Sequence, residues 1–99
     1  MFVIVARFEV RPGEEDAFVA LHESAGRVLS LSKGEAPSRE LLNDARDPST
    51  FISLARFPSR EAAEQRTLEI KKDDWFRRLV SLSRQAPDVG LYRTAWKGK

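Results

Sequence analysis

Apolar and polar positions alternate over residues 2–10 in the pattern of a β-strand. Every second position from Phe2 to Val10 is apolar, and the positions between them begin with valines and end with Arg7 and Glu9. Successive side chains of a strand point to opposite faces, so this segment has one fully apolar face and one mixed face. We predict a strand that one layer of the protein covers completely.

A helical period follows the turn signal Arg11-Pro12-Gly13. Three acids, Glu14–Asp16, would occupy the first turn, where the helix dipole favours negative charge. Apolar residues then recur at helical spacing from Phe18 to Leu29, and Lys33-Gly34 is a typical stop signal. The sequence therefore predicts one long helix between these two signals.

Two more strands are predicted in the middle of the chain and one near its end. The first two, Ser38–Asp44 and Thr50–Phe57, flank the Asp-Pro turn of residues 45–49 and form a hairpin. The last strand is predicted over Val89–Trp96.

The second helical region is interrupted. Ser59 is the expected N-cap of its first segment, and the polar run Lys71–Asp74 breaks the pattern. Asp74 is the expected cap of a second segment, which carries a strong apolar stripe and ends near Gln85–Pro87.

The resulting order, β-α-β-β-α-β, predicts an α+β fold of the ferredoxin-like type, with a four-stranded antiparallel sheet and helices on one face. The other face also carries apolar residues, namely Val3, Val5, Ile52 and Leu54. We predict that a second copy of the chain covers this face and makes a homodimer. The alternative is that these residues are scattered surface positions of high strand propensity.

Composition limits the chemistry available to the chain. The 99 residues predict a single domain over positions 1–99, without cysteine and with one histidine, His22. Disulfides, thiol nucleophiles and cysteine zinc sites are excluded, and one chain cannot form a multi-histidine metal site. No apolar run is long enough to span a membrane, and the start does not resemble a signal peptide, so a cytoplasmic location is expected.

Charge is distributed unevenly along the chain. Residues 1–50 hold 6 basic and 9 acidic side chains, whereas residues 51–99 hold 11 and 6. A basic half can attract anions, and a nucleic-acid binder would need a contiguous basic surface formed by Lys71, Lys72, Arg77, Arg78 and Arg84. A solvated helix face is the simpler interpretation, and we expect no nucleic-acid or membrane partner.

Three stretches in this order resemble one known family, that of the antibiotic biosynthesis monooxygenases in the dimeric α+β barrel superfamily. The matching residues are Val3–Glu15 with Phe18; Leu42–Asp44, Asp47-Pro48, Phe51–Leu54 and Phe57; and Ser59–Ala62, Phe76–Leu79 and Val89–Tyr92. They lie mostly at positions that determine the fold.

The resemblance implies a homodimer with a pocket between the sheet and the helices of each subunit. It also implies oxidation of a small hydrophobic aromatic molecule by molecular oxygen, without metal or flavin, although other members degrade haem or quinones. Haem degradation is not expected here. Haem-degrading members carry an asparagine in the first strand, where this chain has Ala6-Arg7-Phe8. They also carry a histidine shortly after the position of Phe76, where this chain has Leu79 and Val80.

His22 is the candidate catalytic base, because only its side chain has an ordinary pKa near neutrality and it borders the apolar face of the first helix. Packing in the core is the alternative role. Trp75 could stack on a planar substrate, or it could serve only as a core residue.

Arg66, Tyr92 and Asn43 complete the candidate substrate-binding residues. Arg66 lies among alanines and could reach into a cavity to hold an anion or enolate. Tyr92 could donate a hydrogen bond in the pocket or pack between strands. Asn43, like Arg7, could point inward or lie where two subunits meet.

Two functions follow from these residues. The first is a cofactor-independent monooxygenase acting on a phenolic or quinone-like molecule. The second is a non-catalytic dimeric module that binds a small ligand with the same fold.

Overall fold

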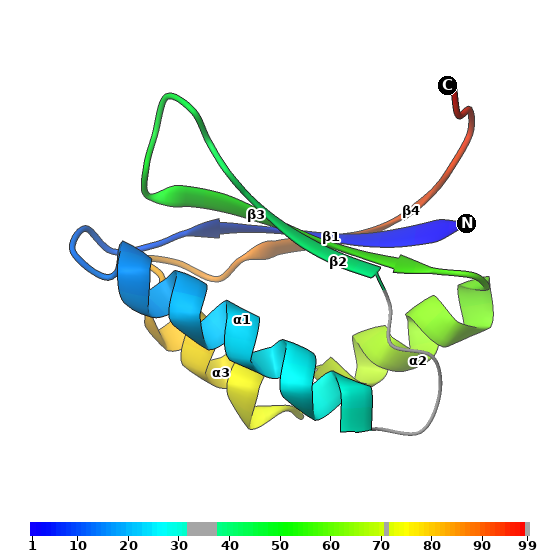
Figure 1. Ribbon diagram of the computed structural model, residues 1–99, viewed down its shortest axis with the longest axis horizontal. Coiled ribbons are helices and arrows are strands. Elements are labelled where there is room, and N and C mark those ends of the chain that lie inside the picture. The colour runs from blue at the N-terminus through cyan, green and yellow to red at the C-terminus, as the bar shows by residue number, and fades with distance from the viewer. Residues whose placement is uncertain (32–37, 71, 99) are drawn as a thin grey trace.

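Four strands and three helices make up the computed structural model, which describes residues 1–31, 38–70 and 72–98 (Figure 1). The elements are β1 (Phe2–Glu9), α1 (Glu15–Leu31), β2 (Ser38–Asn43), β3 (Thr50–Phe57), α2 (Arg60–Ile70), α3 (Asp74–Ser81) and β4 (Asp88–Arg93). The predicted helix stop at Lys33-Gly34 lies outside the described residues. Over the described part of the chain, every helix is too short or too polar to cross a membrane.

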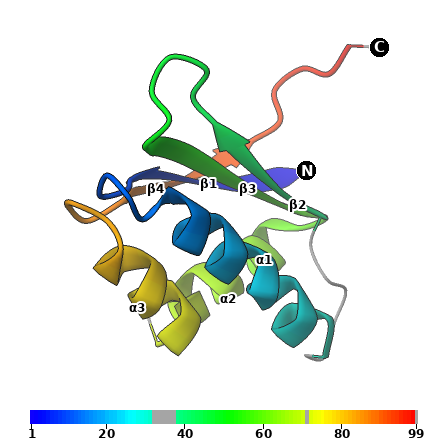
Figure 2. The same ribbon diagram turned by 60° about the vertical axis from the view of Figure 1, so that its left-hand side comes forward.

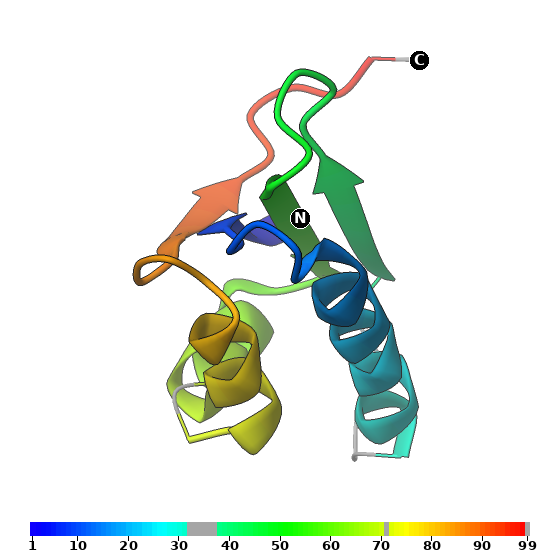
Figure 3. The ribbon, with the colours of Figure 1, turned by 90° about the vertical axis from the view of Figure 1, so that its left-hand side faces the viewer.

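The strands form one antiparallel sheet in the order β2-β3-β1-β4. All three helices lie on the same face of this sheet, as Figures 2 and 3 show from two directions. The predicted ferredoxin-like α+β fold is therefore confirmed. In the central pair, Val5 is opposite Leu54 and Ala6 is opposite Ser53, so the two faces are assigned residue by residue.

The core between sheet and helices has two parts. The larger cluster packs Phe8, Phe18, Phe51 and Leu79 together under α1 and α3. The smaller cluster, Ile4, Phe57 and Ala63, lies under α2. Because Ala63 is the one buried residue of α2, this helix contributes little to the core, as its weak apolar pattern predicted.

Two predicted ends were wrong, and the backbone hydrogen bonds explain both. The last strand stops at Arg93 rather than Trp96, because β1 has no partner residues beyond its start and the N–H of Thr94 binds the Met1 carbonyl. α3 ends at Ser81 because the following segment pairs with the end of β1, where the Arg84 N–H binds the Glu9 carbonyl.

The caps of the second helical region were predicted in part. Ser59 caps α2 as expected, with its hydroxyl accepting the N–H of Ala62. The cap of α3 is Asp73 and not Asp74, since the Asp73 carboxylate accepts the N–H of Trp75. Asp73 and Asp74 are adjacent and either can cap a helix, so the sequence alone did not distinguish them.

The face of the sheet opposite the helices is largely apolar at its centre. Alternation along each strand places Val3, Val5, Ile52, Leu54 and Leu42 on this outer face. Charged residues of both signs surround them. The described residues of the chain provide no cover for this surface, as Figures 1 and 3 show.

Candidate functional site

A small cavity lies between the sheet and the helices. Its floor is built from short side chains of the central strands, Ala6, Ser53 and Ala55. Its volume is about 40 Å³. This volume exceeds the roughly 10–15 Å³ that one water needs, but it is small for an organic molecule.

Trp75 forms one wall of this cavity at the start of α3. Its indole Nε1 donates a 2.7 Å hydrogen bond to the Leu21 carbonyl of α1. Its backbone N–H is held by the Asp73 carboxylate at 2.9 Å. These two contacts fix the ring between the two helices, with one side toward the cavity.

His22 is buried beside Trp75, with 5 % of its surface exposed and 5.6 Å between the two ring centroids. Its Nε2 lies 2.8 Å from the hydroxyl of Ser53, a residue of the cavity floor. Burial, and secondarily the positive charge of Arg39, lowers the pKa of His22 to about 4. The imidazole is therefore neutral at pH 7, with a nitrogen available to accept a proton.

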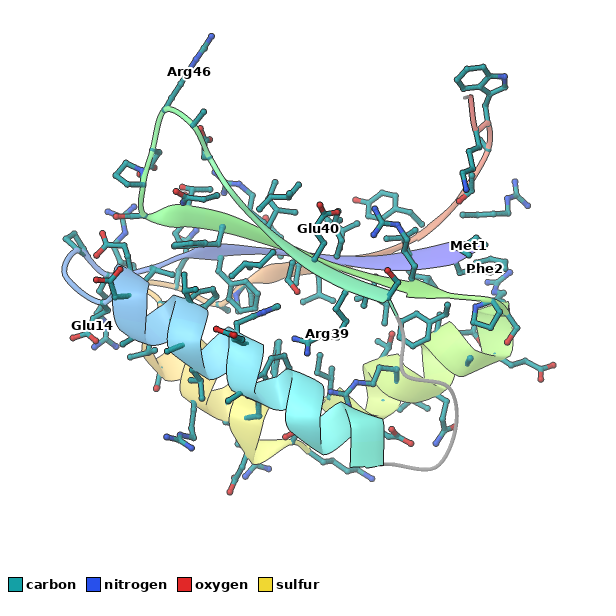
Figure 4. The ribbon with its side chains drawn as sticks, viewed as in Figure 1. Met1, Phe2, Glu14, Arg39, Glu40 and Arg46 are labelled. Atoms are coloured by element: carbon teal, nitrogen blue, oxygen red, sulfur yellow. The ribbon has the colours of Figure 1, made fainter. Side chains whose placement is uncertain are left out.

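Arg39 extends from β2 into the space between the sheet and α1 (Figure 4). Its Nη2 lies 3.3 Å from Nε2 of His22 and donates to the His22 carbonyl oxygen at 3.3 Å. The guanidinium carbon is 5.1 Å from the centre of the Trp75 ring, within the range of a cation–π contact. Arg39 thus joins the histidine and the tryptophan into one assembly.

Among the described residues no ion pair includes Arg39, although the carboxylates of Glu23 and Glu40 line a surface groove beside it. Burial, and then repulsion from Arg66, lowers the pKa of the Arg39 guanidinium. Arg66 itself lines the cavity and pairs with Asp73 at 3.3 Å. Arg66 also lies 4.0 Å from Glu69, so of the two guanidinium groups at the cavity Arg39 is the one without an ion-pair partner among the described residues.

An open groove of about 410 Å³ lies on the surface between α1 and β2. His22 and Arg39 line this groove, and Arg39 lines the interior cavity as well. The Arg39 side chain is therefore part of the wall that separates the two spaces.

Three of the five residues nominated from the sequence gather here, and two do not. Trp75 and Arg66 line the cavity, and His22 contacts two of its lining residues. Tyr92 is 60 % exposed and lies on the outer face, opposite Val3 in the register. Asn43 donates to the carbonyls of Pro48 and Thr50 and holds the hairpin loop. Arg7 also faces outward and pairs with Glu9.

Arg39 and Ser53 are site residues that the sequence did not reveal. In Ser38–Asn43 each face of the strand carries one leucine and at least one polar residue, so alternation alone does not choose the inner face. A signal did exist in the short side chains of the central strands. Ala55 is opposite Arg39, and its short side chain leaves room for a long one on the inner face of the sheet.

Two other kinds of site receive no support in the described residues. These residues hold no group of three His, Cys, Asp or Glu side chains placed to bind a metal. Of the basic residues considered for nucleic acid, Arg77 pairs with Asp74 and Arg84 with Glu9. Lys71 lies outside the described part.

Comparison with solved structures finds the same fold repeatedly. SnoaB from Streptomyces nogalater, a cofactor-independent oxygenase crystallised as the N63A mutant, is 19% identical, with a TM-score of 0.74, 97% of this chain and 94% of that chain covered. Rv0793 from Mycobacterium tuberculosis is 17% identical, with a TM-score of 0.71 and coverages of 99% and 98%. A protein described as an antibiotic biosynthesis monooxygenase is 20% identical, with a TM-score of 0.71 and coverages of 96% and 99%.

Sequence comparison gives the family. No curated protein matches the chain significantly. The family model for antibiotic biosynthesis monooxygenases matches residues 1–67, which is more than half of the chain and includes the strands that carry Arg39 and Ser53. The chain therefore belongs to the antibiotic biosynthesis monooxygenase family.

Proposed function

We propose that the protein is a cofactor-independent monooxygenase that acts on a hydrophobic phenolic or enolisable small molecule. One observation carries the proposal: the apolar cavity is lined by an indole and a partly buried guanidinium, and this guanidinium lies 3.3 Å from the ring of a neutral histidine. Family membership and the oxygenase activity named for a structural neighbour support the same assignment.

In this reaction His22 would accept a proton from the substrate. Arg39 would stabilise the enolate or phenolate that forms, since a positive charge favours the ionised substrate. Negative charge beside the imidazole also raises the pKa of His22, so ionisation of the substrate makes the base stronger at the moment it is needed. Trp75 would hold the ring of the substrate in place.

The electrons come from the substrate. Oxidation of an enolisable CH₂ group by one O₂ gives a carbonyl group and one water, and the two C–H bonds supply the electrons that reduce oxygen. The protein has to bind the substrate, take its proton and keep bulk water away.

A non-catalytic ligand-binding module is the alternative. The apolar lining of the cavity favours this alternative, while its volume of about 40 Å³ is below the several hundred Å³ usual for organic ligands and requires movement of the walls for either function. The open groove beside the cavity favours the enzyme, since movement of Arg39 would enlarge the space that a substrate can use.

Oxygen consumption by the purified protein tests the assignment. We expect uptake with anthrone, whose CH₂ group becomes a carbonyl group, and transfer of the oxygen isotope label from labelled O₂ into that carbonyl. The same assay after treatment with a chelator should give the same rate. A panel of such compounds that bind without any oxygen uptake above the uncatalysed rate would favour the binding module instead.

We further propose that two copies of the chain pair through the outer faces of their sheets. The apolar centre and the surrounding charges of both signs suit a surface that binds its own copy. Leu54 is central on this face, opposite Val5. Leu54→Lys would bury an unpaired charge in the interface, so we expect the dimer to weaken on the order of 100-fold.

Sedimentation velocity over a range of concentrations measures this effect. The wild-type protein should have twice the 11.2 kDa mass of one chain, and the variant should have the mass of one chain. Leu68→Lys is the control, because Leu68 is 64% exposed on α2. A wild-type protein that stays monomeric at micromolar concentration would contradict the proposal.

A further inference from the structure

The position of Arg39 carries an inference about the kind of ligand. Arg39 is the residue that lines both the interior cavity and the groove between α1 and β2. Its charge has no carboxylate partner in the described part of the chain, although it is partly buried and close to the charge of Arg66. A buried charge without a partner destabilises the folded protein.

We propose that the cavity and the groove are two parts of one ligand site, and that Arg39 between them binds an anionic oxygen of the ligand. The ligand class is then a hydrophobic ring compound that carries an ionised group, either a carboxylate or an acidic phenol. This inference rests on the proposed function for the identity of the site, and it adds the charge of the substrate and the residue that selects it.

The contacts of Arg39 explain how one side chain can perform this role. Its guanidinium packs against Trp75 and donates to the His22 carbonyl, and these contacts hold it at the end of the cavity. A guanidinium carries five N–H donors, so others remain for an anion. The apolar lining around Ala55 and Trp75 would accept the ring of the same ligand.

The negative charge of the ligand would also relieve the repulsion between the two arginines. Arg66 is satisfied in part by Asp73 and, at 4.0 Å, by Glu69. Arg39 gains its missing partner when the ligand arrives. A neutral compound of the same shape gives no such gain. The site therefore discriminates by charge before it discriminates by shape.

A matched pair of ligands tests this inference without turnover. Phenylacetate and phenylacetamide have nearly the same shape and differ in charge. The chain has two tryptophans, and Trp96 is 84% exposed, so Trp96→Phe leaves the indole N–H of Trp75 as the single indole signal in a nitrogen-labelled NMR spectrum. The shift of this signal during titration gives both the location and the affinity of each ligand.

We expect phenylacetate to bind at least about tenfold more tightly than phenylacetamide, as for a hydrogen bond to a charged group. Arg39→Met should abolish this preference, and Arg39→Lys should keep part of it. Arg77→Met is the matched control, because Arg77 is 65% exposed on α3, and it should keep the preference entirely. Equal binding of the two ligands, or a preference that survives Arg39→Met, would overturn the proposal.

A second probe separates the two sources of the anion. The ionised form of 4-nitrophenol is coloured, so absorbance reports the pKa of the bound phenol. A pKa lowered on binding, and restored by Arg39→Met, supports a phenolate on Arg39. If only phenylacetate shows dependence on Arg39, the ligand carries a carboxylate.

The sole histidine provides a further check in variants whose urea unfolding curve shows that they are folded, because exposure of His22 on unfolding would raise its pKa as well. Removing the Arg39 charge should raise the pKa of His22, which NMR titration of the imidazole measures. Binding and catalysis can also fail separately. Charge-selective binding without oxygen uptake supports this inference and contradicts the monooxygenase. Oxygen uptake that is unchanged in Arg39→Met supports the monooxygenase and contradicts this inference.

Discussion

His22→Gln should lower the rate of oxygen consumption by about 100-fold or more, the usual contribution of a general base. Glutamine can keep the hydrogen bond to Ser53, which joins Nε2 and Oγ at 2.8 Å in the native protein, but it cannot take up a proton. The variant should therefore bind ligands as the wild type does and lose turnover. Steady-state oxygen uptake and the NMR titration of Trp75 measure the two properties separately.

Tyr92→Phe is the control for this experiment. Tyr92 was a candidate from the sequence, and its position on the outer face, away from the cavity, predicts an unchanged rate. A rate for His22→Gln within a few-fold of the wild type would assign the base to another group.

The pH profile gives an independent test of His22. An unperturbed histidine would lose activity below about pH 6.5. Burial and Arg39 lower the pKa of His22 to about 4, so the neutral form and kcat/KM should persist well below pH 6. The same pKa difference makes the folded protein less stable in acid. The unfolded chain binds a proton between pH 6.5 and about 4 where the folded chain does not, so the free energy of unfolding falls as pH falls through this window.

Phe18→Ala should lower the free energy of unfolding by about 3–5 kcal/mol. Phe18 is fully buried, and its ring centroid lies 5.0 Å from those of Phe8 and Phe51. Truncation leaves a cavity at the centre of the larger core cluster. The loss is a large part of the roughly 5–15 kcal/mol by which such domains are stable.

Urea unfolding at a fixed protein concentration measures this loss, because association would otherwise change the apparent stability. Val19→Ala is the neighbouring control, since Val19 is 40% exposed on the same helix, and we expect a change of about 0.5 kcal/mol or less. A loss below about 1 kcal/mol for Phe18→Ala would mean that this core does not close around the ring.

The sequence predicted the fold well because its strands and helices have strong and different periods. Thr50–Phe57 was predicted with the bounds that the structure has, since its alternation continues to a proline. The face of α1 on which His22 lies was also predictable, because His22 follows Phe18 by four residues, about one helical turn. Its partner Ser53 lies 31 residues away along the chain, and no local pattern connects the two.

The rest of the site depends on strand register, which a single sequence does not specify. Tyr92 faces outward because it is opposite Val3, and a shift by one residue would turn it inward. Arg39 faces inward because it is opposite Ala55. On the edge strand β2 each face carries one leucine, so alternation gives no preference there. On β4 the alternation was informative, because Val89 and Leu91 share the inner face and leave Tyr92 on the outer one.

The division of the core into two clusters has a consequence for how this protein can change. The aromatic cluster around Phe18 holds the fold, whereas the cavity wall from α2 rests on Ala63 and on the partly exposed Arg66 and Ile70. Substitutions at the last two positions alter the ligand space while removing little of the packing that stabilises the chain. For the proposed oxygenase we therefore expect single substitutions at these two positions to change the ligands that bind at a small loss of stability, and libraries at these positions are a suitable start for directed evolution.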